Sequence, residues 1–509
     1  MTESQARFFV APQDEHNQKL LSNVHPVYWS EPKPERMYNL VVIGAGTAGL
    51  ISALGCAVLG GKVALVERHL MGGDCLNVGC VPSKCLIRSA RAAAEISSCN
   101  RLGLTSQEVS TSSFPSVMER VRRLRAEISK NDSAERYGQM GVHVFFGEAS
   151  FADPRSITVN GLKLNFRKAV IATGTSPTLP DISELEEAGF LTNETIFDLT
   201  ELPRRLAVVG GGPLGCELAQ AFSRLGSEVT LVQNSRLLPR EDTEASELLA
   251  SVFMRERICV LLKSRPVRVE RSGNLKRILV RTQHGEQGVE ADEILVCTGR
   301  RPNVGNLNLE KAGIVYNAQT GVVVNDFLQT TNQAVFAAGD VCMDWKYTHA
   351  ADAAARIAVQ NALFFGRKRL STLTMPWCTY TDPEIAHIGL CAQEANARGI
   401  ATDIYRVSFD EVDRAVADGE TEGFVKIVVR KGTDRIIGAT IATAHAGDLI
   451  SEISIAMTEK IGLKKIANVI HPYPTKAEAI RSVAAAYNRT RLTPRISALL
   501  GRWLKWQRG

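Results

Sequence analysis

The chain is organised around GGDCLNVGCVPSK, residues 72–84, where a helix is expected to begin. Two cysteines in this stretch, Cys75 and Cys80, have four residues between them. A disulfide across so short a loop would constrain the unfolded chain little, so it would serve poorly as a structural staple. Strain, exposure and a nearby helix N-terminus would instead lower a thiol pKa and favour reversible exchange. The alternative is a pair of unrelated buried cysteines, and the specific residues around the pair disfavour it.

A dinucleotide-binding fingerprint precedes this stretch. The apolar run at 40–43 is typical of a buried parallel strand, and GAGTAG, residues 44–49, follows it and opens a helical stretch. A second strand at 63–66 ends on Glu67, 23 residues after Gly44, where a carboxylate can hold a ribose diol. Glycines here permit a tight turn and close approach to a pyrophosphate at the helix N-terminus. The three glycines are Gly44, Gly46 and Gly49.

The same unit occurs a second time, about 166 residues later in the chain. A strand at 206–209 leads into GGGPLG, residues 210–215, and a further strand follows at 229–232. Two copies predict two nucleotides, and a redox pair beside one of them suggests FAD plus a nicotinamide. A degenerate repeat without a ligand is disfavoured because all three glycines are kept. They are Gly210, Gly212 and Gly215.

The second copy differs from the first at the position of the acid. Counting 23 residues from Gly210 gives Gln233, and Arg236 and Arg240 follow. Loss of the carboxylate removes repulsion toward a 2′-phosphate, and a nearby arginine can pair with that phosphate. The sequence therefore favours NADPH. NADH is the alternative, because a glutamine can also bind a ribose without a phosphate. In that alternative the arginines are solvated surface charges.

Three shorter segments complete the pattern: ATG at 172–174, CTGRRPN at 297–303 and AAGD at 337–340. Together with the fingerprints and the cysteine pair, they resemble the class I pyridine nucleotide-disulfide oxidoreductases. This flavoprotein family includes dihydrolipoamide dehydrogenase, glutathione reductase and mercuric reductase, and the resemblance covers about residues 38 to 490. It implies an α/β fold with two Rossmann-type domains, for FAD and for NAD(P), and an α+β C-terminal dimerisation domain. The expected boundaries are an N-terminal extension at 1–36, an FAD-binding domain at 37–190 and 303–372, an NAD(P)H-binding domain at 191–302, a dimerisation domain at 373–490 and a basic amphipathic tail at 491–509.

The resemblance also implies roles for site residues. Cys75 and Cys80 would form the redox-active disulfide, with Cys80 next to the flavin and Cys75 as the interchange thiol that meets substrate. Lys84 and Glu217 would form an ion pair at the reactive flavin edge and tune its electronics. Asp340 would contact the flavin ribityl chain. For Arg300 and Arg301, the alternative is that they are ordinary cations at a domain interface. The other implied cofactor positions are Gly73, Lys84, Gly147, Gly174 and Gly299.

The C-terminal segment departs from the family's disulfide reductases, which carry a histidine directly before Pro-Thr and a glutamate five residues after it. Here the stretch is HPYPTKAE, residues 471–478. Tyr473 stands at the position of the histidine, and Glu478 stands at the position of the family's glutamate. Tyrosine titrates near 10 and is a poor general base at neutral pH, whereas histidine titrates near 6.5. Reduction of a thiolate-bound metal ion has less need of a base, because its ligands are already deprotonated. Mercuric reductases resemble this chain in carrying a tyrosine here.

His471, two residues before Tyr473, is the competing candidate. If His471 reaches the interchange thiol Cys75, it can serve as the base of an ordinary disulfide reductase. Otherwise it is a packing or hydrogen-bonding residue near the subunit interface. Members of this family complete each active site with the partner's C-terminal segment, which implies a two-fold homodimer. No cysteine follows Cys391, so the C-terminal cysteine pair with which mercuric reductases hand over the metal has no counterpart here. A metal-carrier motif of paired cysteines is also absent from residues 1–36, so the natural acceptor need not be mercury.

The predicted function is therefore electron transfer from NADPH through FAD and Cys75–Cys80 to a thiol-reactive small molecule or metal ion, as in mercuric reductases. One alternative is dihydrolipoamide dehydrogenase or another disulfide reductase that uses His471 as its base. A second is a flavin redox sensor without turnover, which intact motifs for both nucleotides disfavour.

Composition narrows the setting. The 509 residues suffice for about three domains, and eleven scattered cysteines, an odd number, favour a reducing, cytoplasmic compartment. We expect no membrane-spanning helix, secretory signal or resident metal site, and the mild net charge of +6 does not indicate binding to nucleic acid.

After Glu478 the chain has seven basic residues and no acidic one, and an apolar helical face includes Trp503. That face suits an anionic membrane surface, but packing on the dimer or another domain is favoured.

Overall fold

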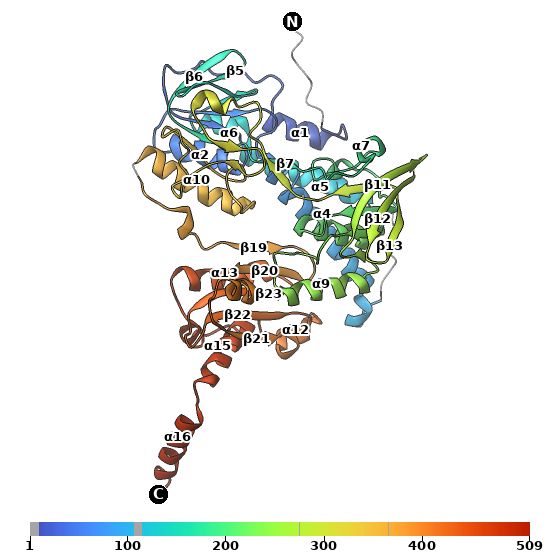
Figure 1. The fold of residues 1–509 in the computed structure, drawn as a ribbon, viewed down its shortest axis with the longest axis vertical. Helices are drawn as coiled ribbons and strands as arrows, with labels where there is room; N and C mark the ends of the chain where they lie inside the picture. The colour runs from blue at the N-terminus through green and yellow to red at the C-terminus, as the bar shows by residue number, and fades with distance from the viewer. Residues whose placement is uncertain (1–9, 106–113, 274, 365) are drawn as a thin grey trace.

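The computed structural model describes residues 10–105, 114–273, 275–364 and 366–509 (Figure 1). The first fingerprint lies on a sheet whose parallel strands pair in the order β3-β2-β1-β6-β18. The short antiparallel strands β4 and β5 extend it beside β6, and helices α2 and α10 pack together on it. The bounds are β1 (Tyr38–Ile43), α2 (Thr47–Ala57), β2 (Val63–Glu67), β3 (Val142–Phe146), β4 (Ser150–Asp153), β5 (Ser156–Val159), β6 (Leu162–Ile171), β18 (Val335–Ala337) and α10 (Thr348–Leu363).

The second fingerprint lies on a four-stranded parallel sheet in the order β10-β9-β8-β14. An antiparallel sheet of β11, β12 and β13 follows β10 in the chain, and β7 pairs with β15 where the chain passes between the two parallel sheets. The bounds are β7 (Thr175–Pro177), β8 (Arg205–Val209), α8 (Pro213–Arg224), β9 (Glu228–Val232), α9 (Thr243–Arg255), β10 (Cys259–Leu261), β11 (Arg265–Ser272), β12 (Leu275–Thr282), β13 (Gly285–Ala291), β14 (Glu293–Val296) and β15 (Arg300–Pro302).

A five-stranded antiparallel sheet in the order β19-β20-β23-β22-β21 follows, with α13 and α15 packed on it. The predicted α/β class, with two Rossmann-type sheets and a C-terminal α+β unit, is confirmed. The bounds are β19 (Pro376–Thr379), β20 (Glu384–Gly389), α11 (Ala392–Ala397), β21 (Thr402–Ser408), α12 (Asp413–Asp418), β22 (Phe424–Arg430), β23 (Ile436–Thr443), α13 (Ala446–Thr458), α14 (Leu463–Ile466), α15 (Glu478–Thr490) and α16 (Pro494–Trp506). Shorter pieces elsewhere are α6 (Ala134–Gln139), α7 (Leu185–Ala188), β16 (Tyr316–Asn317) and β17 (Gly321–Val322).

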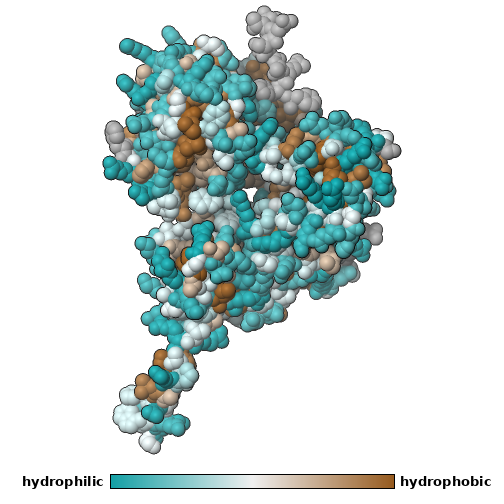
Figure 2. Space-filling view, in the orientation of Figure 1, coloured by the Kyte–Doolittle hydropathy of each residue, from teal (hydrophilic) through white to brown (hydrophobic). Residues whose placement is uncertain are grey.

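The two ends of the chain behave differently. Helix α1 (Glu15–Val24) lies within the predicted extension, yet it packs on α5 (Phe114–Ser129) and buries Leu20 and Val24 in the core beside the first sheet. Helix α16 instead projects from the body, and none of its side chains is buried (Figures 1 and 2). None of the helices in the described ranges is both long and apolar enough to cross a membrane.

Candidate functional site

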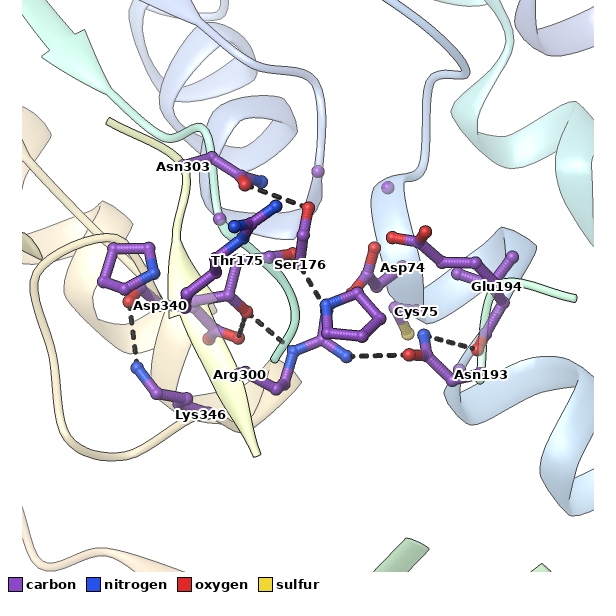
Figure 3. Close-up of a pocket in the computed structure, with 18 of the residues that line it drawn as sticks. Asp74, Cys75, Thr175, Ser176, Asn193, Glu194, Arg300, Asn303, Asp340 and Lys346 are labelled. Atoms are coloured by element: carbon purple, nitrogen blue, oxygen red, sulfur yellow. Dashed lines mark hydrogen bonds and ion pairs between the residues drawn. The ribbon is translucent and has the colours of Figure 1, made fainter. Parts of the chain in front are cut away.

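Residues from both fingerprints line one large cavity of about 3720 Å³. A site for one small ligand usually measures roughly 300–1000 Å³, so this cavity has room for more than one nucleotide. The crossing strands β7 and β15 and the start of α4 (Cys80–Ser97) also contribute to its wall. Figure 3 shows part of that wall, where side chains from segments far apart in the sequence point toward one another.

The first fingerprint forms a tight turn at one end of the cavity. Gly44 has a φ of +98°, and a Cβ there would lie 2.5 Å from the backbone oxygen of Ala172, so the position requires glycine. Glu67 accepts hydrogen bonds from the backbone N–H groups of Ala45 at 2.6 Å and His69 at 2.8 Å. Burial raises the pKa of Glu67, while these two donors oppose the rise. The carboxylate is thus held at the cavity wall, where the fingerprint predicts a ribose.

The second fingerprint repeats this arrangement. The Gln233 Oε1 atom accepts a hydrogen bond of 3.0 Å from the Gly211 N–H, the equivalent of the Glu67 contact with Ala45. Gly212 lines the cavity, and a Cβ there would meet no atom within 4 Å. That open space beside a helix N-terminus fits a pyrophosphate, because a backbone without a side chain allows close approach.

The arginines after Gln233 separate in the structure. The Nη2 atom of Arg236 donates to the backbone oxygens of Pro239 and Glu241, at 2.9 and 2.6 Å, which ties this guanidinium to its own loop. Arg240 lines the cavity instead, together with Arg265 at the start of β11. Arg265 was missed by the sequence analysis, because no fixed spacing relates it to the fingerprint.

The central stretch folds into two helices, α3 (Gly73–Asn77) and α4, and α4 begins at Cys80. Cys75 and Cys80 both line the cavity as free thiols in hydrogen-bonding contact, so the disulfide between them stays a prediction. The hydrogen bond from Cys75 lowers the pKa of Cys80 to about 6, with further help from Thr348, whose Oγ1 lies 3.2 Å away, and from the charge of Lys84. The same contact, with burial, raises the pKa of Cys75. The pair is therefore poised as a thiolate at Cys80 and a thiol at Cys75.

Lys84 and Glu217 join α4 to α8 beside this pair. The Nζ atom of Lys84 lies 2.8 Å from a carboxylate oxygen of Glu217, which is almost fully buried. The other carboxylate oxygen accepts from the Tyr380 N–H at 2.9 Å, and the Lys84 Nζ lies 4.5 Å from the centre of the Tyr380 ring. Burial acts to lower the pKa of Lys84, but the charge of Glu217 prevails and raises it. A fixed cation therefore stands near the Cys80 sulfur.

A hydrogen-bonded network at β7 and β15 surrounds Asp340 (Figure 3). Thr175 donates to the Asp340 carboxylate at 3.1 Å, and Arg300 Nε donates to the Thr175 hydroxyl at 2.7 Å. Arg300 also contacts Asn193 at 3.4 Å and pairs with Asp74, one residue before Cys75. Burial raises the pKa of Asp340, and the charge of Arg300 opposes the rise. Thr175, Asn193 and Thr348 belong to no motif, so no sequence pattern indicated them. The remaining predicted positions Gly46, Gly73, Gly147, Gly174 and Gly299 line the cavity, whereas Gly49 and Gly215 pack behind their turns against Gly44 and Gly210.

The C-terminal candidates lie on the third sheet's unit. The His471 side chain is 5% exposed, and its Nε2 lies 3.0 Å from a carboxylate oxygen of Glu452. Tyr473 is 71% exposed, and its hydroxyl donates to Asp413 at 3.0 Å. Glu478 begins α15. Among the described residues that line the cavity, none of the three candidates appears, so one chain alone does not bring them to Cys75.

Comparison with known proteins gives concordant matches. The family model "pyridine nucleotide-disulphide oxidoreductase" matches residues 38–356, and the dimerisation domain of that family matches residues 375–484. The mercuric reductase of Lysinibacillus sphaericus is 34% identical over 456 residues, which span 89% of this chain and 83% of that protein. The mercuric reductase of Streptomyces lividans is 35% identical over 460 residues, 88% of this chain and 96% of that protein.

Solved structures also resemble the chain over most of its length. The HOCl-induced flavoprotein disulfide reductase RclA from Escherichia coli superposes with a TM-score of 0.78 at 25% identity, covering 88% of this chain and 99% of that one. LpdA from Mycobacterium tuberculosis superposes with a TM-score of 0.80 at 28% identity, again covering 88% and 99%.

Proposed function

Because the chain belongs to the pyridine nucleotide-disulphide oxidoreductase family, and is thus an enzyme that uses FAD and a pyridine nucleotide, we propose that it reduces a thiolate-bound metal ion. Mercuric ion is the acceptor for which its relatives are named. When bound, FAD and the nicotinamide supply two electrons to the Cys75–Cys80 pair. The carrying observation is that Tyr473 is exposed while His471 is held inside its own unit.

The residues of this chain suit a soft metal ion. The hydrogen bond from Cys75, together with Thr348 and the charge of Lys84, lowers the pKa of Cys80 to about 6, so Cys80 is a thiolate at neutral pH. Cys75, the interchange thiol, gives up its proton when a soft cation takes its sulfur as a ligand. Thiolate ligands select such ions, and two electrons reduce a divalent ion to the metal. No thiolate leaving group has to be protonated, so the reaction does not depend on a histidine base.

The dimer supports this choice of acceptor. The matched dimerisation domain supports a homodimer, and we propose that Tyr473 of one subunit completes the site of the other. The Tyr473 ring is exposed and can contact a partner surface, although its hydroxyl donates to Asp413, whereas the His471 ring is buried against Glu452. The same His471–Glu452 pair is what favours the second candidate, a disulfide reductase, because a carboxylate that orients a histidine is typical of a general base.

An acceptor panel tests the two candidates. Purified enzyme with NADPH is offered mercuric ion, lipoamide, oxidised glutathione and quinones, and we expect turnover of mercuric ion.

Tyr473→Phe should lower the turnover of mercuric ion roughly 10-fold or more, because it removes a hydroxyl contact to a charged site. His471→Gln should leave the turnover of mercuric ion within about twofold of the wild-type value, because in this proposal His471 supports the fold and takes no part in the reaction. Lipoamide or glutathione turnover that is lost in His471→Gln would favour the disulfide reductase, and no turnover of any acceptor would favour the redox sensor.

We propose NADPH as the preferred nucleotide. No carboxylate occupies the Gln233 position, and the cationic side chains of Arg240 and Arg265 line the same cavity, so a 2′-phosphate there has arginines with which to pair. The same panel, run with each nucleotide, should give a kcat/KM for NADPH at least about 10-fold above that for NADH. Equal values would contradict the preference.

The sequence favours packing of the C-terminal helix on the dimer or another domain, but no side chain of α16 is buried in the described chain. We therefore propose that α16 rests on an anionic membrane surface, and that the enzyme is cytoplasmic. Ile496, Leu499, Leu500, Trp503 and Leu504 are all exposed on this helix, and basic residues flank them. Figure 2 shows hydrophobic surface on this projecting helix. The intact enzyme should pellet with phosphatidylglycerol vesicles but less with phosphatidylcholine vesicles, and deletion of residues 495–509 should abolish pelleting. Pelleting that survives the deletion would contradict this proposal, and a truncated protein that becomes monomeric would place the helix on the partner subunit instead.

A further inference from the structure

Part of the cavity wall comes from chain outside the matched family model, which begins at residue 38. His25, Pro26, Val27 and Tyr28 line the cavity, and we call residues 25–28 the arm loop. It lies at the same end of the cavity as Glu67, because the ring of His25 packs 4.3 Å from that of Phe146 on β3, the strand beside β2. The arm loop therefore lies outside the region that the family model matches, and it lies at the first fingerprint.

The arm loop is fixed at both of its ends. On one side, Val24 is fully buried and its backbone oxygen accepts from the Met71 N–H at 3.1 Å. On the other side, the indole N–H of Trp29 donates to the backbone oxygen of Val144 on β3 at 3.0 Å. Residues between two such anchors lose much of their conformational freedom on folding, whether or not a ligand is bound. The loop is thus a preformed part of the wall.

Two large side chains on this fixed loop are exposed to solvent. Val27 is 71% exposed and Tyr28 is 97% exposed, although both line the cavity. A nucleotide site gains affinity when flat aromatic and aliphatic side chains cover the base, and such side chains cost little entropy when the loop is already fixed. The neighbours of the arm loop in the wall, Glu67 and Phe146, belong to the end of the fingerprint where the ribose and base of a dinucleotide lie.

We propose that the arm loop covers the adenosine half of FAD, with Tyr28 and Val27 packing on it and slowing its release. This inference rests on the proposed seat of FAD at the first fingerprint. It adds to the family's fingerprint a binding contact from residues that the family model does not include.

FAD release from the holoenzyme tests the arm loop. Free FAD fluorescence after dilution should appear roughly 3- to 10-fold faster in Tyr28→Ala, and faster by a smaller factor in Val27→Ser. The matched control is Val58→Ser, because Val58 is 73% exposed, follows α2 beside the same sheet and does not line the cavity. The control should release FAD at the wild-type rate. Apoprotein reloaded with FMN, which lacks adenosine, should bind FMN equally in the wild type and in Tyr28→Ala.

Several results would overturn the inference. Wild-type release rates in both Tyr28→Ala and Val27→Ser would show that the arm loop makes no contact with FAD. An equal weakening of FAD and FMN would show that the loop supports the fold rather than the adenosine. A wild-type protein purified without FAD, and unable to take it up, would overturn the proposed function itself and this inference with it.

Discussion

Cys75→Ala is expected to lower acceptor turnover by roughly 10³-fold or more, while the protein keeps its fold and its FAD. Cys75 lies on the short helix α3 at the cavity wall, so removal of its sulfur leaves no clash and little buried space. Without it, Cys80 has no partner sulfur, and the pair can neither store two electrons nor present two thiolates to a metal ion. Steady-state rates with mercuric ion and NADPH measure the loss.

The same variant has a second readout that a damaged fold would not give. The Cys75 hydrogen bond is the largest cause of the low Cys80 pKa, about 6, so its removal should raise that pKa. Alkylation of Cys80 in the reduced wild type should increase as the pH rises through about 6, and in Cys75→Ala the rise should come at higher pH. Mass mapping of Cys80 after timed iodoacetamide treatment follows both curves.

Cys85→Ala is the matched control for this prediction. Cys85 stands five residues beyond Cys80 on α4, packs against the core, and has a pKa raised by burial. Turnover in Cys85→Ala should stay close to that of the wild type. Turnover in Cys75→Ala within tenfold of the wild-type value would contradict the proposal that the Cys75–Cys80 pair carries electrons to the acceptor.

Local sterics explain why the turns of the two fingerprints were predictable from the sequence. Gly44 and Gly210 adopt φ values of +98° and +112°, which glycine alone takes at little cost, so their spacing marks each turn directly. Glu67 and Gln233 follow from the length of one strand–helix–strand unit, and both bond the turn of their own copy. These relations span a few tens of residues, and that short range is why a sequence pattern records them.

Contacts between distant segments were not predictable. Thr348 reaches the Cys80 sulfur from 268 residues away, because α10 begins where α4 begins, and no motif marks it. Trp29, directly after the arm loop, bonds to Val144 on β3, 115 residues away, although only an N-terminal extension was expected at 1–36. Spacing also did not distinguish Arg236, which is tied to its loop, from Arg240, which lines the cavity. Packing decides each of these cases.

Gly210→Ala and Gly212→Ala should fail in different ways, although both change one glycine of the second fingerprint to alanine. At Gly210 the φ of +112° is strained for alanine, and the new Cβ would lie 2.5 Å from the backbone oxygen of Cys297. Left-handed strain and overpacking each cost about 1–3 kcal/mol, so we expect a clear fall in Tm together with lower nicotinamide binding. Thermal denaturation of the holoenzyme measures the fall.

Gly212→Ala should keep the wild-type Tm and lose NADPH affinity instead. Gly212 has an extended backbone, with φ −77° and ψ −177°, which alanine adopts freely, and its Cβ would enter open cavity. A methyl group at the approach of a pyrophosphate should raise the KM for NADPH roughly 10- to 100-fold, since overpacking by one carbon costs about 1–3 kcal/mol. FAD content should not change, because the first fingerprint is untouched. An unaltered KM would mean that the nicotinamide nucleotide does not bind at the second fingerprint, and the two-nucleotide arrangement of the cavity would then be wrong.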